Sequence, residues 1–198
     1  MIFLSLSLCA TAQNDEYIPK LRFEVGANFG IESFFSSDLS ILDNQTHENY
    51  FAQSVAINLG VRTSSVFAGL DFILTALQPN NAEDITLYAL GIYTGDYYPF
   101  NNRFGAKLAV GCYWRYYANE FIVNDMEHKY NRHGFMASVL AGLYFKANSN
   151  TNIEATIKYS ASTFEDNDKT IDGIPSTLPK NSVLSSITPS IGINFFIP

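Results

Sequence analysis

The stretch LRFEVGANFGIE, residues 21–32, has apolar residues at every odd position and charged, polar or glycine residues at every even position. Because a β-strand directs successive side chains to opposite faces of its sheet, this pattern predicts a strand with one apolar and one polar face. The same period recurs along the chain and predicts an all-β fold. We expect eight strands, at residues 20–33, 50–62, 64–77, 85–97, 103–117, 133–146, 152–162 and 183–197.

Two of these segments fit the alternation less well. In 64–77, Phe67 and Ile73 are large apolar residues that break the pattern. In 85–97 both faces carry Leu and Tyr, and we expect the register that places Gly91 and Gly95 on the polar face. The apolar face of that segment then holds Tyr88, Leu90 and Ile92.

The links between the expected strands alternate in length. Those at 34–49, 78–84, 118–132 and 163–182 are long, whereas Thr63 alone, 98–102 and 147–151 are short. Up-and-down barrels of the bacterial outer membrane show this asymmetry, with short periplasmic turns and longer outer loops. The glycines of the clear strands fall on the polar face, where a narrow barrel needs small residues inside. The fold class that we expect is an eight-stranded antiparallel up-and-down β-barrel.

The composition agrees with a single membrane-associated domain. The chain has 198 residues, which suits one domain. Charged residues make up 16%, against roughly 25% in an average soluble domain. The net charge of −7 argues against a nucleic-acid partner, because a phosphate backbone requires a basic face. No continuously apolar stretch is long enough to predict a transmembrane helix.

The first residues resemble an export signal. An apolar stretch at residues 2–8 precedes the small residues Ala10 and Ala12, which predicts a signal peptide at 1–12 and a barrel domain at 13–198. A lipoprotein signal ending at Cys9 is disfavoured, because Leu8 is too large for the position before the cysteine. After cleavage only Cys112 remains, so no internal disulfide is expected.

Alternation alone does not decide which face meets water. A membrane barrel turns its apolar face to lipid, whereas a soluble lipocalin-like barrel encloses an apolar ligand. The polar face carries charges of both signs inside the strands, and Trp114 is the only tryptophan, without the Gly-x-Trp of lipocalins. Aromatic residues also gather near strand ends, as at membrane interfaces. They are Phe34, Phe35, Tyr50, Phe51, Trp114, Tyr116, Tyr117 and Phe121 at one rim and Tyr97, Tyr98, Phe100, Phe104, Phe195 and Phe196 at the other.

These features together resemble the small outer-membrane β-barrel proteins of Gram-negative bacteria, of the OmpA-transmembrane-domain, OmpX and opacity-protein type, including forms common in Bacteroidota. The resemblance covers the mature chain and is architectural. It implies outer-membrane lipid and lipopolysaccharide as surroundings and recognition by the barrel-assembly machinery. The ending GINFFIP, residues 192–198, approximates the aromatic-rich last strand of such proteins but places Ile-Pro after the aromatic residues.

The polar face supplies the candidate site. We expect Glu24, Asp71, Lys107 and Lys158 to form an ion-pair network in a lumen filled by side chains, because opposite charges compensate each other's desolvation. A proton or ion gate is the less favoured alternative. Cys112 is expected to face lipid, and Pro189 to cause a bulge or bend because it lacks a backbone donor.

Other chemistry is not supported by the residues. Asp166–Gly173 superficially resembles a calcium loop but lacks the glycine at its sixth position and the closing glutamate, where Thr177 stands. The histidines His47, His128 and His133 lie in or beside long links, without the His-x-Ser spacing of lipid A deacylases. We therefore assign no catalytic, cofactor-binding or metal-binding residue.

The sequence favours a monomeric outer-membrane barrel that is structural or binds an unidentified surface partner through its outer loops, with both termini in the periplasm. The alternative is a soluble secreted or periplasmic barrel that binds a small apolar ligand.

Overall fold

The computed structural model describes residues 21–35, 50–63, 65–77, 85–123, 126–176 and 182–197, so the predicted signal peptide lies outside the described residues. Within these ranges the chain forms nine strands and no α-helix. No described segment forms a helix long and apolar enough to cross a membrane. The strands are β1 Arg22–Phe35, β2 Tyr50–Arg62, β3 Val66–Leu77, β4 Ile85–Pro99, β5 Phe104–Val123, β6 Met126–Asn148, β7 Thr151–Ile171, β8 Ile174–Ser176 and β9 Ser182–Ile197.

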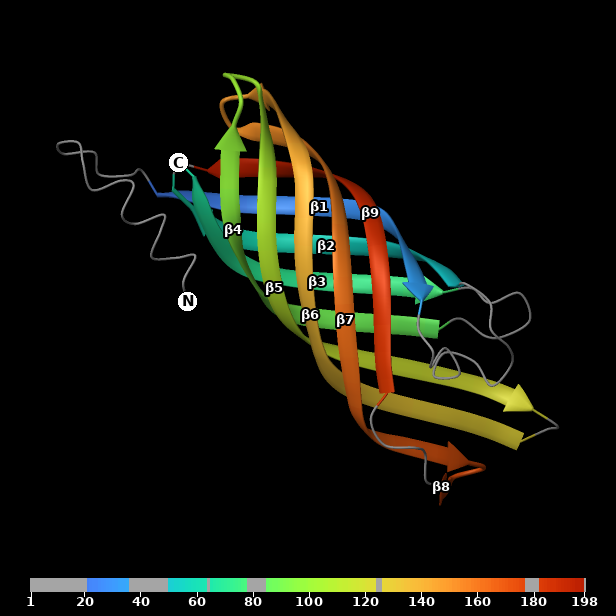
Figure 1. The fold of residues 1–198 in the computed structure, drawn as a ribbon. Helices are drawn as coiled ribbons and strands as arrows, with labels where there is room; N and C mark the ends of the chain where they lie inside the picture. Colours follow the sequence, from blue (N-terminus) through green and yellow to red (C-terminus); the bar gives the residue numbers. More distant parts are fainter. Residues whose placement is uncertain are drawn as a thin grey trace.

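Eight of the strands close into a barrel (Figure 1). Each strand from β1 to β7 pairs with the next, β7 then pairs with β9, and β9 pairs with β1. All of these pairings are antiparallel. The short strand β8 pairs with β7 alone and lies outside the ring. The expected eight-stranded up-and-down barrel is confirmed.

The two ends of the barrel differ. At one end, called here the short-turn end, β2–β3, β4–β5 and β6–β7 are joined by the brief connections 63–65, 100–103 and 149–150. The start of β1 and the finish of β9 lie at this end, where Phe23 pairs with Ile197 (Figure 1). The opposite end, called the long-link end, carries the connections after β1, β3, β5 and β7.

Side chains alternate between the lumen and the outside as the sequence predicts. Along β1 the even residues from Glu24 to Phe34 point inward, whereas Phe23, Phe29 and Ile31 are more than half exposed. The ambiguous fourth strand has the expected register. Its outward residues Tyr88, Leu90 and Ile92 are exposed, and Leu87, Ala89, Tyr93 and Tyr97 are buried in the lumen.

Strands β5, β6 and β7 are longer than predicted. The last pair between β4 and β5 is Thr86 with Ala118, but β5 and β6 continue to pair as far as Val123 and Met126. The expected outer links 118–132 and 163–182 are therefore mostly strand, and residues 124–125 alone separate β5 from β6. Beyond a barrel rim both faces of a sheet contact water, so the sequence there has no reason to alternate. Without the alternation of apolar and polar residues, these strand ends cannot be recognised from the sequence.

A tight hairpin was also missed in the same region. Ile171 pairs with Ile174, and the two residues between them, Asp172 and Gly173, have φ values of 49° and 76°. Two successive positive φ angles define the type I′ turn, for which Asp-Gly is a favoured sequence. The segment compared above with a calcium loop is thus the end of β7 and a turn into β8.

Pro189 lies at a gap in the pairing of β1 with β9 that leaves the register of the two strands unchanged. The pairing of β1 with β9 skips from Gly30 and Ser190 to Ser33 and Ile187, yet the register is the same on both sides of the gap. Pairing of Pro189 with Ile157 of β7 is retained, so the missing donor falls on the β1 side. Of the expected bulge or bend, the bulge is wrong because no extra residue is inserted, and the structure has a local gap in pairing at this point.

The barrel lumen as the candidate functional site

Two ion pairs lie in the lumen, and both join strands that do not pair with each other. The Nζ atom of Lys107 on β5 lies 2.8 Å from Oε2 of Glu154 on β7. The Nη2 atom of Arg115 on β5 lies 3.0 Å from Oε1 of Glu32 on β1. All four side chains are buried, so each charge depends on its partner for compensation.

The Glu32–Arg115 pair, which lies nearer the long-link end, also forms hydrogen bonds with hydroxyl groups. Oε1 of Glu32 also accepts a hydrogen bond of 2.6 Å from Ser186, and its Oε2 accepts one of 2.7 Å from Thr75. Nη1 of Arg115 donates to Ser162 over 3.1 Å. Both carboxylate oxygens of Glu32 are thus hydrogen-bonded, which offsets the cost of burying its charge. Nε of Arg115 is buried and has no hydrogen-bond partner among the described residues.

The four charged residues that were predicted to point into the lumen do so, but the groups that they contact differ from those expected. Glu24, Asp71, Lys107 and Lys158 are all buried inside the barrel. Lys107 pairs with Glu154 instead of Glu24 or Asp71, and Oδ2 of Asp71 accepts a hydrogen bond of 3.1 Å from the Tyr113 hydroxyl. The prediction is wrong in its direct ion pairs, since none joins two of these four residues, although the charges of Lys107 and Lys158 act on Glu24 and Asp71. Strand alternation defines a face, whereas the stagger of the closed sheet decides which side chains meet across it.

The pair Glu32–Arg115 was not singled out from the sequence. Both residues stand at polar-face positions of their segments, so the signal that existed was their shared orientation toward the lumen. Their mutual distance depends on the barrel's stagger, which the alternating pattern does not contain.

Inward aromatic side chains close the lumen at the short-turn end. Phe67 packs against Tyr97 with a centroid distance of 4.9 Å, and Tyr97 meets Tyr144 edge to face at 5.1 Å. The Arg62 guanidinium carbon lies 4.2 Å from the Tyr97 ring centroid and 4.4 Å from that of Phe196. We call Arg62, Phe67, Tyr97, Tyr144 and Phe196 the aromatic plug. Phe67, which breaks the sequence alternation, is thus an inward-facing plug residue.

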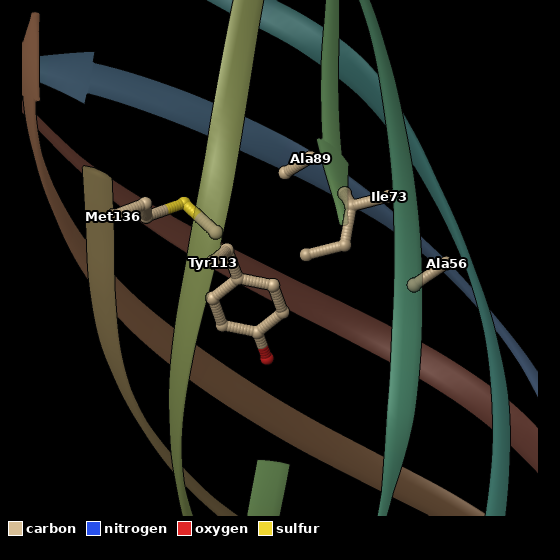
Figure 2. Packing of buried hydrophobic residues seen from close by; sticks show 5 residues of the cluster. All are labelled: Ala56, Ile73, Ala89, Tyr113 and Met136. Carbon is tan, nitrogen blue, oxygen red and sulfur yellow. The ribbon is translucent and has the colours of Figure 1, made fainter. Parts of the chain in front are cut away.

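A second apolar layer crosses the interior (Figure 2). Figure 2 shows its side chains on the inside of the wall, with the Tyr113 ring beside Met136. Strands β2 to β6 contribute one residue each. We call this layer the partition, and its residues are Ala56, Ile73, Ala89, Tyr113 and Met136. All five are buried, which explains why Ile73 stands at a polar-face position. Ile73, Ala89 and Met136 of the partition line a hollow beside Glu32 and Arg115, whereas Ala56 and Tyr113 line a polar cavity.

The outer surface is apolar along every strand of the ring. Representative exposed residues are Phe29, Ile57, Leu70, Leu90, Val110, Val139, Ile157 and Ile191, one from each strand. Soluble monomers rarely expose a continuous apolar surface of this extent, whereas membrane barrels present one to lipid. Cys112 is exposed on this face, as expected.

The predicted aromatic rims are confirmed only in part. Phe34, Tyr97, Tyr117 and Phe196 are at most 5% exposed and point into the lumen. Nothing is described of the Tyr50 and Phe121 side chains. The aromatic residues that do face outward are Phe35, Phe51, Trp114, Tyr116, Tyr98, Phe100, Phe104 and Phe195.

The described residues contain no group of three or more His, Cys, Asp and Glu side chains arranged to hold a metal ion. His133 stacks on Trp114 of the outer surface with a centroid distance of 5.1 Å. His47 lies outside the described residues, and the side chain of His128 is not described.

No protein-family model matches the chain, and no curated protein sequence matches it. Similar solved structures exist. Neisserial surface protein A is 17% identical with a TM-score of 0.59, and the match covers 87% of this chain and 96% of that one. The N-terminal β-barrel domain of Pseudomonas aeruginosa OprF is 14% identical with a TM-score of 0.50, over 89% and 97%.

The outer membrane protein AlkL, solved in lipid bilayers, is 10% identical with a TM-score of 0.52, over 93% of this chain and 97% of that one. At these identities the likeness concerns the fold. The chain has the fold of the small outer-membrane β-barrels, which confirms the resemblance inferred from its sequence.

Proposed function

We propose that this protein is an outer-membrane β-barrel with a lumen filled by side chains, and that it acts as a structural and surface-interaction protein through its long-link end. The observation that carries this proposal is the apolar outer surface around all eight strands, combined with an interior of paired charges and packed aromatic rings. A soluble barrel for an apolar ligand needs the reverse arrangement.

The orientation follows from the connections. Outer-membrane barrels place short turns in the periplasm and longer segments outside the cell. By this rule the short-turn end, with both termini of the barrel, faces the periplasm, and the long-link end faces the exterior. The last strand β9 is the segment that we expect the barrel-assembly machinery to recognise.

The extended part of β5 and β6 offers a surface for a partner. Residues 119–123 of β5 pair with β6 on one side, and no described strand pairs with their other side. An unpaired strand edge presents backbone donors and acceptors to which an extended segment of another protein can add. We name residues 119–130 the outer hairpin and infer that it is the contact element.

A non-catalytic role is part of the proposal. The outward-facing His133 stacks on an aromatic ring of the outer surface, and the buried carboxylates Glu32 and Glu154 are engaged by cations. Acyl transfer requires an accessible nucleophile with a base within hydrogen-bond reach. The hydroxyl groups of Ser186 and Thr75 do meet a carboxylate, but they are buried in the lumen and that carboxylate, Glu32, pairs with Arg115.

The location is tested by fractionation and surface proteolysis of intact cells that produce the protein. We expect heat-modifiable migration on gels, recovery in the outer-membrane fraction and cleavage within the outer hairpin while the ring stays intact. A chain that remains soluble without detergent would contradict the membrane location and favour the apolar-ligand alternative.

The contact element is tested by shortening it. Ala118 pairs with Asn131, so the outer hairpin can be replaced by Asn-Gly, which joins paired residues with a two-residue turn. We expect the shortened barrel to keep its heat-modifiable migration while cells that produce it adhere less to serum-coated surfaces. The control replaces Asn101 and Asn102 in a short turn by Gly and Ser. Equal adhesion of cells with the full and the shortened barrel would overturn the role of the outer hairpin.

A further inference from the structure

Three cationic side chains lie at the short-turn end of the barrel, where the lumen opens. Arg22 begins β1, Arg62 ends β2, and Lys146 lies near the end of β6. Each is partly exposed, and Arg62 also belongs to the aromatic plug. This group of positive charges occurs in a chain whose net charge is −7. We call these three residues the basic mouth.

Contacts across the end of the barrel link the three residues. Arg22 and Arg62 are paired across β1 and β2. Nη1 of Arg22 donates a hydrogen bond of 3.2 Å to the carbonyl oxygen of Ser149, in the turn that follows β6. The Arg62 charge acts on Tyr144, which lies two residues before Lys146 on the same face of β6. The three cations therefore lie around one opening of the lumen.

The charges of the basic mouth lack direct acidic partners. Neither ion pair of the lumen includes one of its residues, and no other carboxylate of the described residues lies within 4.0 Å of its cationic groups. Glu24 acts on Arg62 from inside the lumen, and Asp96 accepts a hydrogen bond of 3.4 Å from the Tyr98 hydroxyl. Like charges directly opposite each other on a sheet repel, as Arg22 and Arg62 do. The basic mouth therefore has a surplus of positive charge that an anion would neutralise.

The cationic groups keep hydrogen-bond donors for such an anion. The rings of Tyr97 and Phe196 cover the Arg62 guanidinium, and its Nε donates to the Thr63 carbonyl oxygen over 3.3 Å. No described residue accepts a hydrogen bond from its Nη atoms or from the Lys146 ammonium group. Guanidinium groups bind both phosphate and carboxylate, and lysine binds phosphate as a point charge. A tetrahedral phosphate directs oxygens to several sides and can meet donors from three strands, whereas a carboxylate has two oxygens in one plane.

We propose that the basic mouth is a binding site for a phosphate group. Arg22, Arg62 and Lys146 hold its oxygens, and its negative charge relieves the repulsion between the paired arginines. The headgroup of an anionic phospholipid and a soluble phosphate both offer this chemistry.

The surroundings of the basic mouth favour the phospholipid headgroup as the source. Phe23 directly follows Arg22 and is 57% exposed on the outer surface, and its partner Ile197 is 53% exposed. The cations thus lie at the border of the apolar surface, the level at which headgroups meet a membrane protein. An acyl chain can lie along these two side chains while the phosphate reaches the lumen opening. This source rests on the proposed membrane location of the barrel.

The test is solution nuclear magnetic resonance of the ¹⁵N-labelled protein, folded in maltoside micelles without phosphate, while dihexanoyl-phosphatidylglycerol is added. Each arginine gives an Nε–H signal. We expect the signals of Arg22 and Arg62 to shift until they saturate, whereas that of Arg115, buried beside Glu32, stays in place. Unmoved signals of Arg22 and Arg62 would overturn the proposal. Because the spectrum itself shows that the barrel is folded, such a failure would leave the membrane location unaffected.

Two further titrations identify the source of the phosphate. Inorganic phosphate represents the soluble anion, and sodium acetate at equal ionic strength reports unspecific attraction of anions. Saturation at a lower concentration of dihexanoyl-phosphatidylglycerol than of inorganic phosphate would assign the site to a lipid headgroup, and the reverse order would assign it to a soluble phosphate. A response to acetate equal to both would contradict a phosphate site.

A matched pair of variants on β6 tests the site itself. Lys146→Gln removes one cation and should weaken binding of the preferred phosphate ligand about fivefold. Lys129→Gln removes an exposed lysine of the same strand at the long-link end and should leave the affinity unchanged. Equal weakening in both variants would mean that total charge decides the binding, which would refute the site. The titration of the unchanged chain stands by itself if a variant does not fold.

Discussion

Individual side chains inside the barrel are held by groups from strands across the lumen. The Glu32 carboxylate receives hydrogen bonds from Arg115, Thr75 and Ser186, which come from three other strands. Such convergence fixes the relative positions of strands that do not pair with one another. A buried ion pair adds little net stability by itself, but removal of one partner leaves an uncompensated charge.

Arg115→Met tests this dependence. Glu32 is 3% exposed and would lose its direct cationic partner, so we expect the free energy of unfolding to fall by about 3–5 kcal/mol. The measurement is urea unfolding in lipid vesicles, followed by Trp114 fluorescence. Adding Glu32→Gln should recover part of the loss, whereas Arg103→Met in an exposed turn should change stability by less than about 0.5 kcal/mol. A double variant as unstable as Arg115→Met would contradict the ion-pair explanation.

Glycine is required where two strands approach closely. Gly60 and Gly69 are paired across β2 and β3, and a Cβ atom at Gly69 would lie 2.7 Å from Gly60 Cα and against the Leu59 carbonyl oxygen. Gly69→Val should therefore lower the free energy of unfolding by about 1–3 kcal/mol, measured in the same assay. Ala68→Val, one residue away on the exposed outer face, is the control and should be close to neutral. Equal effects of the two substitutions would show that the lumen is not tightly packed there.

Strands and their faces follow from local sequence, but their lengths and cross-lumen partners do not. The period of two in LRFEVGANFGIE, residues 21–32, correctly predicts a strand and its inward residues. The same rule misses the ends of β5, β6 and β7, because a sheet with water on both faces needs no alternation. The Asp172–Gly173 turn was recognisable from its residues alone. Phe67 and Ile73 depart from alternation because they fill the lumen.

The gap at Pro189 belongs to the scale of the strand. Because proline lacks a backbone donor on the side facing β1, Pro189→Val should restore the hydrogen bond toward Ile31. We expect a gain of about 0.5–1.5 kcal/mol in the free energy of unfolding and slow amide exchange at position 189. Ile191→Val, which keeps its backbone donor on the same strand, serves as control. Rapid exchange at residue 189 in the variant would mean that the gap has another cause.

At the scale of the whole molecule, the barrel is an inside-out domain. Apolar side chains cover the outside of the ring, and the polar residues Asn58, Asn152 and Asn194 are buried within it. In water this arrangement would expose a large apolar surface, whereas in a bilayer the surface is solvated by lipid chains. The long-link end of the molecule is the extended sheet of β5, β6 and β7, with β8 at its margin (Figure 1).

The central claim is that the apolar face of the strands contacts lipid, and Trp114 reports on it directly. This only tryptophan of the chain is 47% exposed on the outer face of β5. The measurement is quenching of its fluorescence by lipids brominated along their acyl chains, after the protein has folded into vesicles. We predict strong quenching by the brominated chains and weak quenching by aqueous iodide. Strong quenching by iodide, without quenching by the brominated lipids, would contradict the account.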